Sequence, residues 1–214
     1  MDNIKKNMQQ ALLELDQILD ESSTVVILDS GTLLGLYRDG GFLDLDHEID
    51  ISTTDRGCLK RIAKTLKDRG MAYRYWYYCG KPYKIEFSIF LGSMKIVVDL
   101  KLFTDEKELW SCPAIGRRSA HFKNNNQKAY ITNLKKFIKS NIDFGRFPFN
   151  QIVFHDSWVV PKNYFNEKKI LEGYSNIETP KDIEAYLSYR YSNWKIKKSA
   201  WVSHKDDGGF RKSL

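Results

Sequence analysis

The stretch from Val25 to Thr53 limits, more than any other, what this chain can fold into. It opens with the short β-branched run Val25–Leu28, which is typical of a buried strand. Residues 32–38 then have the pattern of two helical turns, with Ser30 as the expected N-cap. Residues 40–41, both glycine, are expected to end this helix because glycine allows a positive φ. The stretch therefore begins with a strand, a tight turn and a short helix.

A second strand is predicted directly afterwards, and its acidic residues alternate with other types. A period of two places Asp46, Glu48 and Asp50 on one face, with the last two about 7 Å apart along the chain. Carboxylates this close repel one another unless a cation lies between them. The pattern therefore predicts that Glu48 and Asp50 bind a hard divalent cation such as Mg²⁺. A strand with a solvated acidic face is the alternative.

A third carboxylate stands in the apolar run of residues 95–103. Asp99 is costly to bury there without a partner. A metal ion held by Glu48 and Asp50 would supply one, so we expect Asp99 to be a further metal ligand. The alternative is an exposed aspartate on an edge strand.

The remaining pattern favours an α+β fold with a mixed β-sheet flanked by helices. Helices are expected at residues 4–21, 59–69, 163–171 and 179–189, and further strands at 71–78, 83–91 and 158–161. Residues 1–110 are predicted to form a catalytic core. Residues 111–214 are predicted to form a mostly helical region packed on that core as one compact unit. Asp206 and Asp207 are expected to lie in a flexible acidic tail, the alternative being a lid that reaches the site.

Composition narrows the functional classes. The chain of 214 residues has a net charge of +7, which favours an anionic partner such as a nucleotide, a phosphorylated glycan, nucleic acid or an anionic membrane face. It contains no apolar run of about 18 residues and no signal-like segment at its start, so we expect a soluble cytoplasmic protein. The three scattered cysteines are expected to be reduced thiols.

The central motifs also resemble those of a known family. They are Gly31-x-Leu33-Leu34-Gly35-x-x-Arg38, Gly41-Phe42-Leu43 and Asp46-x-Glu48-Ile49-Asp50-Ile51. Together they are similar to the signature of the LicD/fukutin-type proteins of the nucleotidyltransferase superfamily, and residues 97–103 and 158–194 are similar more loosely. The chain lacks the family's Pro-Trp pair, and Glu48 stands within what is usually a run of aspartates.

This resemblance implies a nucleotidyltransferase-like fold and a metal-dependent phosphotransferase. Such an enzyme moves a phospho-alcohol, of the phosphocholine, glycerol-phosphate or ribitol-phosphate type, from a CDP-activated donor to a glycan hydroxyl. The products would serve cell-surface polysaccharide, capsule or teichoic-acid-like synthesis, and CMP would leave. Glu48, Asp50 and Asp99 would bind one or two Mg²⁺ or Mn²⁺ ions, with Asp99 a ligand or the base for the acceptor hydroxyl. A lipid-linked acceptor at the inner membrane face would make the protein peripheral to the membrane.

The resemblance also assigns residues to the substrate side of the site. These are Ser30, Gly31, Thr32, Arg38 and Asp46. The first three begin a helix, where backbone N–H groups receive phosphate oxygens. Arg38 is a candidate for a bidentate phosphate contact, and a structural salt bridge to Asp44 or Asp46 is the open alternative.

Two other function classes stay open. A nucleotidyltransferase would instead attach the nucleotide to RNA, a protein or a small molecule such as an antibiotic. The positive charge permits this, but no RRM or KH signature is present, so nucleic acid is not the expected partner. A non-catalytic binding protein with the same fold is the other alternative, against which the three acidic positions argue.

Overall fold

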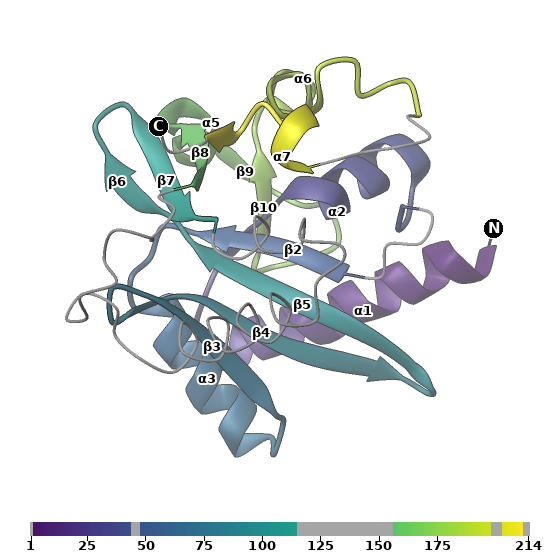
Figure 1. Ribbon diagram of the computed structural model, residues 1–214. Coiled ribbons are helices and arrows are strands. Elements are labelled where there is room, and N and C mark those ends of the chain that lie inside the picture. Colours follow the sequence, from purple (N-terminus) through teal and green to yellow (C-terminus); the bar gives the residue numbers. More distant parts are fainter. Residues whose placement is uncertain (1, 44–47, 115–155, 198–202, 212–214) are drawn as a thin grey trace, which may run out of the picture.

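A computed structural model describes residues 2–43, 48–114, 156–197 and 203–211 (Figure 1). Its centre is a seven-stranded mixed sheet with the strand order β3-β4-β5-β2-β1-β10-β9. These strands are β1 (Val26–Leu28), β2 (Glu48–Thr53), β3 (Tyr73–Tyr78), β4 (Lys81–Leu91), β5 (Met94–Leu102), β9 (Lys168–Ile170) and β10 (Ile177–Pro180). The mixed sheet with helices agrees with the predicted α+β class.

A smaller antiparallel sheet in the order β11-β8-β7-β6 adjoins the large one. Its strands are β6 (Thr104–Glu106), β7 (Leu109–Pro113), β8 (Ser157–Pro161) and β11 (Phe210–Arg211). The helices are α1 (Asp2–Glu21), α2 (Ser30–Leu34), the π-helix η1 (Gly35–Asp39), α3 (Cys58–Asp68), α5 (Lys162–Asn166), α6 (Ile183–Tyr191) and α7 (Ser203–Asp206). Among the described residues, none of the helices is both long enough and apolar enough to cross a membrane.

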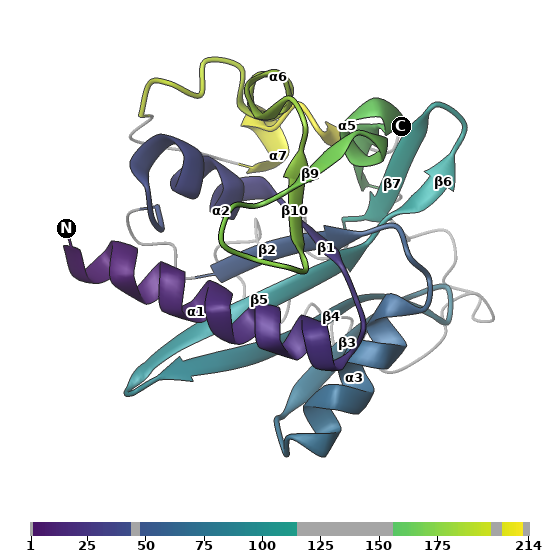
Figure 2. The same cartoon turned by 180° about the vertical axis from the view of Figure 1, so that it is seen from behind.

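Alternating side chains give the large sheet one apolar and one polar face. The apolar face of β2, β4 and β5 includes the buried residues Ile49, Ile51, Ile85, Phe87, Val98 and Leu100. Helices α1 and α3 pack on this face, as Figure 2 shows from behind. Because successive side chains on a strand point to opposite sides, the charged residues between them lie on the other face. The core therefore leaves the charged face available for a site.

The turn from β1 into α2 differs from the prediction in its capping residue. Asp29, not Ser30, is the N-cap, and its carboxylate accepts a hydrogen bond from the Ser30 N–H. Ser30 is the first helical residue and has a φ of 51°. The predicted N-cap was wrong because the strand ends at Leu28 as expected but the helix begins at Ser30, two residues before the predicted start.

Glycines shape the end of this helical segment as predicted. Helix α2 continues directly into η1, and Gly40 ends it with a φ of 70°. A Cβ atom on Gly35 would lie 2.5 Å from the carbonyl oxygen of Gly41. Only glycine at position 35 therefore allows the returning chain to pack this closely against the helix.

The C-terminal region contributes strands as well as helices. β10 pairs in parallel with β1, and β9 extends the large sheet beyond it. The predicted boundary after residue 110 falls inside β7. Within the described part of residues 111–214, the end of β7 and four further strands accompany α5, α6 and α7. Strands of both predicted regions therefore share the same sheets.

Two predicted C-terminal helices have different limits in the structure. The helix expected at residues 163–171 ends at Asn166 and is followed by β9. The helix expected from Thr179 was wrong at its start, because Thr179 and Pro180 belong to β10. Helix α6 begins after Asp182, whose carboxylate accepts a hydrogen bond from the Ala185 N–H. The pairing of β10 with β1 therefore prevailed over the local helix-start pattern, in which Thr179 would be the N-cap and Pro180 the first helical residue.

Candidate active site

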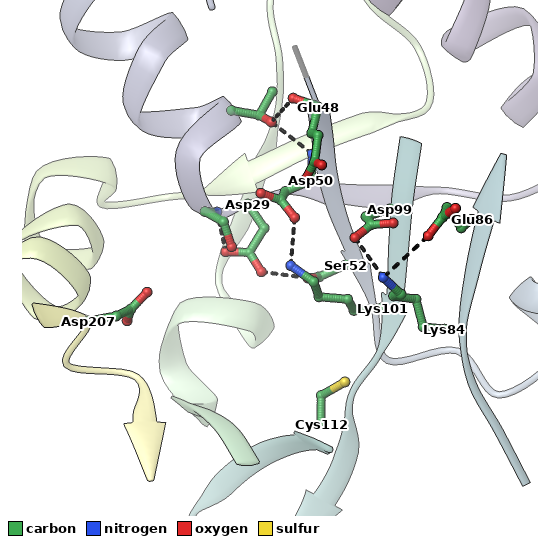
Figure 3. A network of polar contacts seen from close by, with 12 residues as sticks. Asp29, Glu48, Asp50, Ser52, Lys84, Glu86, Asp99, Lys101, Cys112 and Asp207 are labelled. Carbon is green, nitrogen blue, oxygen red and sulfur yellow. Dashed lines mark hydrogen bonds and ion pairs between the residues drawn. The ribbon is translucent and has the colours of Figure 1, made fainter. Parts of the chain in front are cut away.

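Two rows of polar side chains cross the charged face of strands β2, β5 and β4 (Figure 3). The first row consists of the register partners Asp50, Asp99 and Glu86. The second row consists of Ser52 and Lys101, two residues after Asp50 and Asp99, and Lys84, two residues before Glu86 on the antiparallel β4. Neighbouring strands lie about 4.8 Å apart, so side chains within a row are in reach of one another. The parallel pairing of β2 with β5 thus brings two predicted site residues, Asp50 and Asp99, side by side.

Lysine ammonium groups lie between these carboxylates. Lys101 Nζ is 2.6 Å from Asp50 Oδ1, and Lys84 Nζ is 2.7 Å from Asp99 Oδ2 (Figure 3). Lys84 Nζ is also 3.9 Å from Glu86 Oε2. Each lysine therefore reaches from its own strand to a carboxylate on the neighbouring one. The positive charges reduce the repulsion that the acidic residues would otherwise exert on one another.

Lys101 is under the influence of three carboxylates. Burial favours the neutral amine, but the negative charges of Asp50, Asp29 and Asp99 outweigh this effect and raise the pKa of Lys101. The ammonium is therefore charged at neutral pH. Sequence reasoning did not select either lysine, because lysines on the polar side of an alternating strand are typical of an ordinary solvated face.

One carboxylate oxygen of the site has no partner among the described residues. Asp99 Oδ1 is buried and accepts no hydrogen bond there, although Oδ2 of the same group contacts Lys84. An unpaired buried carboxylate oxygen is unfavourable. A cation bound at Oδ1 would satisfy it, so the geometry fits the predicted role of Asp99 as a ligand.

The predicted metal ligands are only partly drawn together. Glu48 lies two residues before Asp50 on the same face of β2 and is exposed. Within the described ranges, no group of three or more His, Cys, Asp or Glu side chains has a metal-binding arrangement. The convergence of Glu48, Asp50 and Asp99 on one cation therefore stays a prediction. Asp46 and Asp44 lie outside the described residues.

The start of α2 is joined directly to the acidic strand. Thr32 Oγ1 donates a hydrogen bond to the Glu48 carbonyl oxygen at 3.2 Å and accepts one from the Asp50 N–H at 2.8 Å. Thr32 thus positions the backbone that carries both carboxylates. Ser30 Oγ accepts a hydrogen bond from Arg190, and Gly31 is partly exposed beside it. The diphosphate contacts expected from these three residues remain untested.

A buried ionic cluster lies behind the turn. Asp29, Arg190 and Asp207 are 1%, 3% and 7% exposed. Arg190 Nη1 is 3.0 Å from Asp29 Oδ1, and its Nε and Nη2 atoms bind the Asp207 carboxylate at 2.7 and 2.8 Å. Tyr186 and Ser52 also donate hydrogen bonds to Asp29. The cluster joins β1, α6 and the C-terminal segment.

The prediction that Asp207 lies in a flexible acidic tail was wrong. Besides its contact with Arg190, the Asp207 carboxylate accepts a hydrogen bond from the Gly209 N–H. The Val159 N–H donates to the Gly209 carbonyl, and Phe210 pairs with Trp158 in β11 and β8. Asp207 accepts hydrogen bonds from Nε and Nη2 of the buried Arg190, two donors that Asp29 does not engage, which explains why this acidic segment is held in place.

Asp29 is ionised in spite of its burial. Desolvation alone would raise its pKa, but the charges of Arg190 and Lys101 and the hydrogen bonds from Ser52 and Tyr186 lower the pKa below the ordinary value. The unfolded-state pKa of aspartate is about 3.9. Ionised Asp29 therefore adds stability that is fully present above about pH 4 and is lost as the pH falls through the folded-state pKa.

Asp29→Asn should lower the pH dependence of stability in this acidic range. The wild type is expected to lose more free energy of unfolding than the variant between pH 7 and pH 3, because the asparagine has no proton to take up. Urea unfolding midpoints at several pH values measure this. Asp105→Asn, which changes an exposed aspartate, should follow the wild type. Parallel pH curves for wild type and Asp29→Asn would contradict the assignment.

Arg38 forms structural contacts in the described protein. Its Nε and Nη2 atoms donate to both oxygens of Asp39, at 3.0 and 2.9 Å, and Nη1 donates to the Trp194 carbonyl oxygen at 3.1 Å. Trp194 also packs against Tyr37, with ring centroids 5.5 Å apart. Arg38 thereby ties η1 to the chain after α6. The guanidinium is occupied by these partners, which favours a structural role over a phosphate contact. Its carboxylate partner is Asp39, and the expected partners Asp44 and Asp46 lie outside the described residues.

Arg38→Lys tests this interpretation. Lysine keeps the charge but cannot reproduce the planar bidentate contact, so the variant should lose about 1–2 kcal/mol of stability with near-normal turnover. Thermal melting and steady-state kinetics on the same protein measure both effects. Unchanged melting with a tenfold or larger loss of turnover would instead assign Arg38 to the substrate.

Comparison of the sequence with protein-family models and with curated proteins gives no match. The resemblance of the central motifs to the LicD/fukutin type therefore rests on the residues themselves.

Proposed function

We propose that this protein is a metal-dependent phosphotransferase of the LicD type. The observation that carries the proposal is the register of β2 and β5, which sets Asp50 beside Asp99 on the polar face of the sheet. Two carboxylates on adjacent strands, next to the start of a helix, are suited to phosphate chemistry with a divalent cation. On this proposal the mixed sheet is a nucleotidyltransferase-like one.

The turn and the carboxylates would act as one unit. Thr32 bonds the backbone of both Glu48 and Asp50, so the start of α2 cannot move independently of the acidic strand. The N–H groups of residues 30–32 are proposed to face the donor diphosphate, as those at a helix start do in phosphate-binding proteins. This arrangement would hold the phosphates at a constant position relative to the carboxylates.

Glu48, Asp50 and Asp99 are the residues proposed to hold Mg²⁺ or Mn²⁺. Asp99 Oδ1, which has no partner in the described part of the chain, supports this assignment. When bound, such an ion neutralises negative charge on the phosphates and lowers the barrier to displacement at phosphorus. Asp99 is also proposed to accept the proton of the attacking hydroxyl, because its carboxylate lies beside Asp50 on the polar face of the sheet.

The donor and acceptor are proposed from the resemblance to the LicD type and from the positive net charge of the chain. The donor would be a CDP-activated alcohol carrying phosphocholine, glycerol phosphate or ribitol phosphate, and CMP would leave. The acceptor would be a glycan hydroxyl, with a lipid-linked glycan at the inner membrane face as one form. The net charge of +7 favours these anionic compounds.

One assay separates the proposal from its two rivals. The protein is incubated with CDP-choline, CDP-glycerol, CDP-ribitol, ATP or CTP, each with Mg²⁺ or Mn²⁺, and released CMP and pyrophosphate are measured. CMP from a CDP-alcohol supports the phosphotransferase. Pyrophosphate from ATP or CTP supports a nucleotidyltransferase, and the absence of both products with measurable nucleotide binding supports a binding protein. An Asp50→Asn, Asp99→Asn double variant prepared in parallel controls for contaminating activity.

A further inference from the structure

Lys101 occupies a position on the polar face that favours a cation. Its Nζ atom is 2.6 Å from Asp50 Oδ1, and its side chain is only 17% exposed. Asp29 and Asp99 add to the negative potential that keeps the ammonium charged. Figure 3 shows the ammonium pointing to the Asp50 carboxylate, between the turn and β5. A divalent ion attracted to the same carboxylates meets a cation already in place.

We propose that Lys101 is an internal counter-ion and that a divalent cation must displace its ammonium from Asp50 in order to bind. The inference rests on the metal site of the proposed function. An ammonium and a divalent cation cannot share Asp50 at short distance without repulsion. At about 4 Å this repulsion weakens binding about thirtyfold even at the dielectric constant of water.

Lys84, in contrast, need not be displaced for a divalent cation to bind. It contacts Asp99 through Oδ2 and is shared with Glu86, on the side away from Asp50. Asp99 Oδ1 has no partner in the part of the chain that the structure describes. Lys84 and a metal ion can therefore bind different oxygens of Asp99 at the same time. Lys101 instead interacts with Asp50, Asp29 and Asp99 together, and so occupies the space between these carboxylates that the ion would need.

Displacement of Lys101 has a consequence for the donor. The released ammonium remains beside Asp29 and becomes available to an anionic phosphate at the site. Nucleotide binding would thus stabilise the arrangement that metal binding requires, and the reverse holds equally. The metal should bind weakly to the protein alone and more tightly once a nucleotide diphosphate is present.

Direct Mn²⁺ binding tests the inference without any turnover. Free Mn²⁺ is measured by electron paramagnetic resonance during titration of the wild type and of Lys101→Met, at fixed pH and without nucleotide. Methionine is neutral and of similar length, so Lys101→Met should bind Mn²⁺ at least about tenfold more tightly than the wild type does. Adding CDP should tighten binding in the wild type and have little effect in the variant.

Lys168→Met is the matched control. Lys168 Nζ is 2.6 Å from Glu178 Oε2 on β9 and β10 of the same sheet, so the substitution removes the same charge from a similar pair. Glu178 is three strands from Lys101 in the sheet, about 14 Å. The Mn²⁺ affinity of Lys168→Met should therefore equal that of the wild type.

Equal or weaker Mn²⁺ binding by Lys101→Met, including no binding by either protein, overturns the inference. Should Lys101→Met fail to fold, amine labelling of the wild type tests the inference instead. Adding Mn²⁺ should increase the acetylation of Lys101 severalfold and leave that of Lys168 unchanged. If the acetylation of Lys101 does not change, the inference is overturned. Tighter Mn²⁺ binding by the variant without CMP release by the wild type would uphold the counter-ion role and reject the phosphotransferase.

Discussion

Asp50→Asn is expected to reduce turnover of a CDP-activated donor by about a thousandfold or more, equivalent to about 4 kcal/mol of transition-state stabilisation. The substitution removes a proposed metal ligand that lies beside Asp99. The fold should be retained, because the amide oxygen can still accept a hydrogen bond from Lys101 and because one negative charge leaves the acidic row. Release of CMP and thermal melting measure the two effects.

Glu178→Gln provides the matched control for Asp50→Asn. Glu178 also pairs with a lysine at 2.6 Å in the same sheet, but it is three strands from Lys101. Its replacement should leave turnover within about twofold of the wild type, since surface pairs contribute little and it contacts no proposed ligand. Wild-type turnover in Asp50→Asn would remove Asp50 from the site. A large drop in melting temperature would show instead that Asp50 acts mainly through its pair with Lys101.

Arg190→Met should have the largest effect on stability of the substitutions considered. It leaves Asp29 and Asp207 as two buried carboxylates without their guanidinium partner. Breaking a buried ion pair in this way costs about 3–5 kcal/mol. For a chain of this size the melting temperature should fall by roughly 10 °C. Urea unfolding and thermal melting give both quantities.

Two further variants show whether the effect comes from the buried cluster. Lys195→Met removes the same charge from the exposed pair with Glu184 and should change stability by less than about 0.5 kcal/mol. Arg190→Lys keeps the charge but loses the fork, so it should fall between Arg190→Met and the wild type. A melting temperature of Arg190→Met within a degree or two of the wild type would mean that water or a rearranged tail replaces the arginine.

Local pattern was sufficient for the elements whose residues are neighbours in sequence. The apolar run at residues 25–28, the glycine stop after η1 and the alternation of β2 follow from backbone sterics and from the burial of every second side chain. Asp50 and Asp99 could be selected as candidates for the same reason, since each interrupts a predicted strand with a carboxylate. Whether they bind a metal is still a prediction.

Tertiary structure alone decided which charges meet. Arg190 lies 161 residues from Asp29 in the sequence, and Lys101 lies 51 residues from Asp50. Neither pair has a local signature, because an arginine in a short helix and a lysine on a polar strand face are common on solvated surfaces. The parallel register of β2 with β5, and the pairing of β10 with β1, bring these residues together, Arg190 and Asp29 as a buried pair and Lys101 and Asp50 as a partly buried one. Strand pairing also overrode the helix-start signal at Thr179, because backbone hydrogen bonds to β1 and β9 satisfy groups that a helix would have left unpaired.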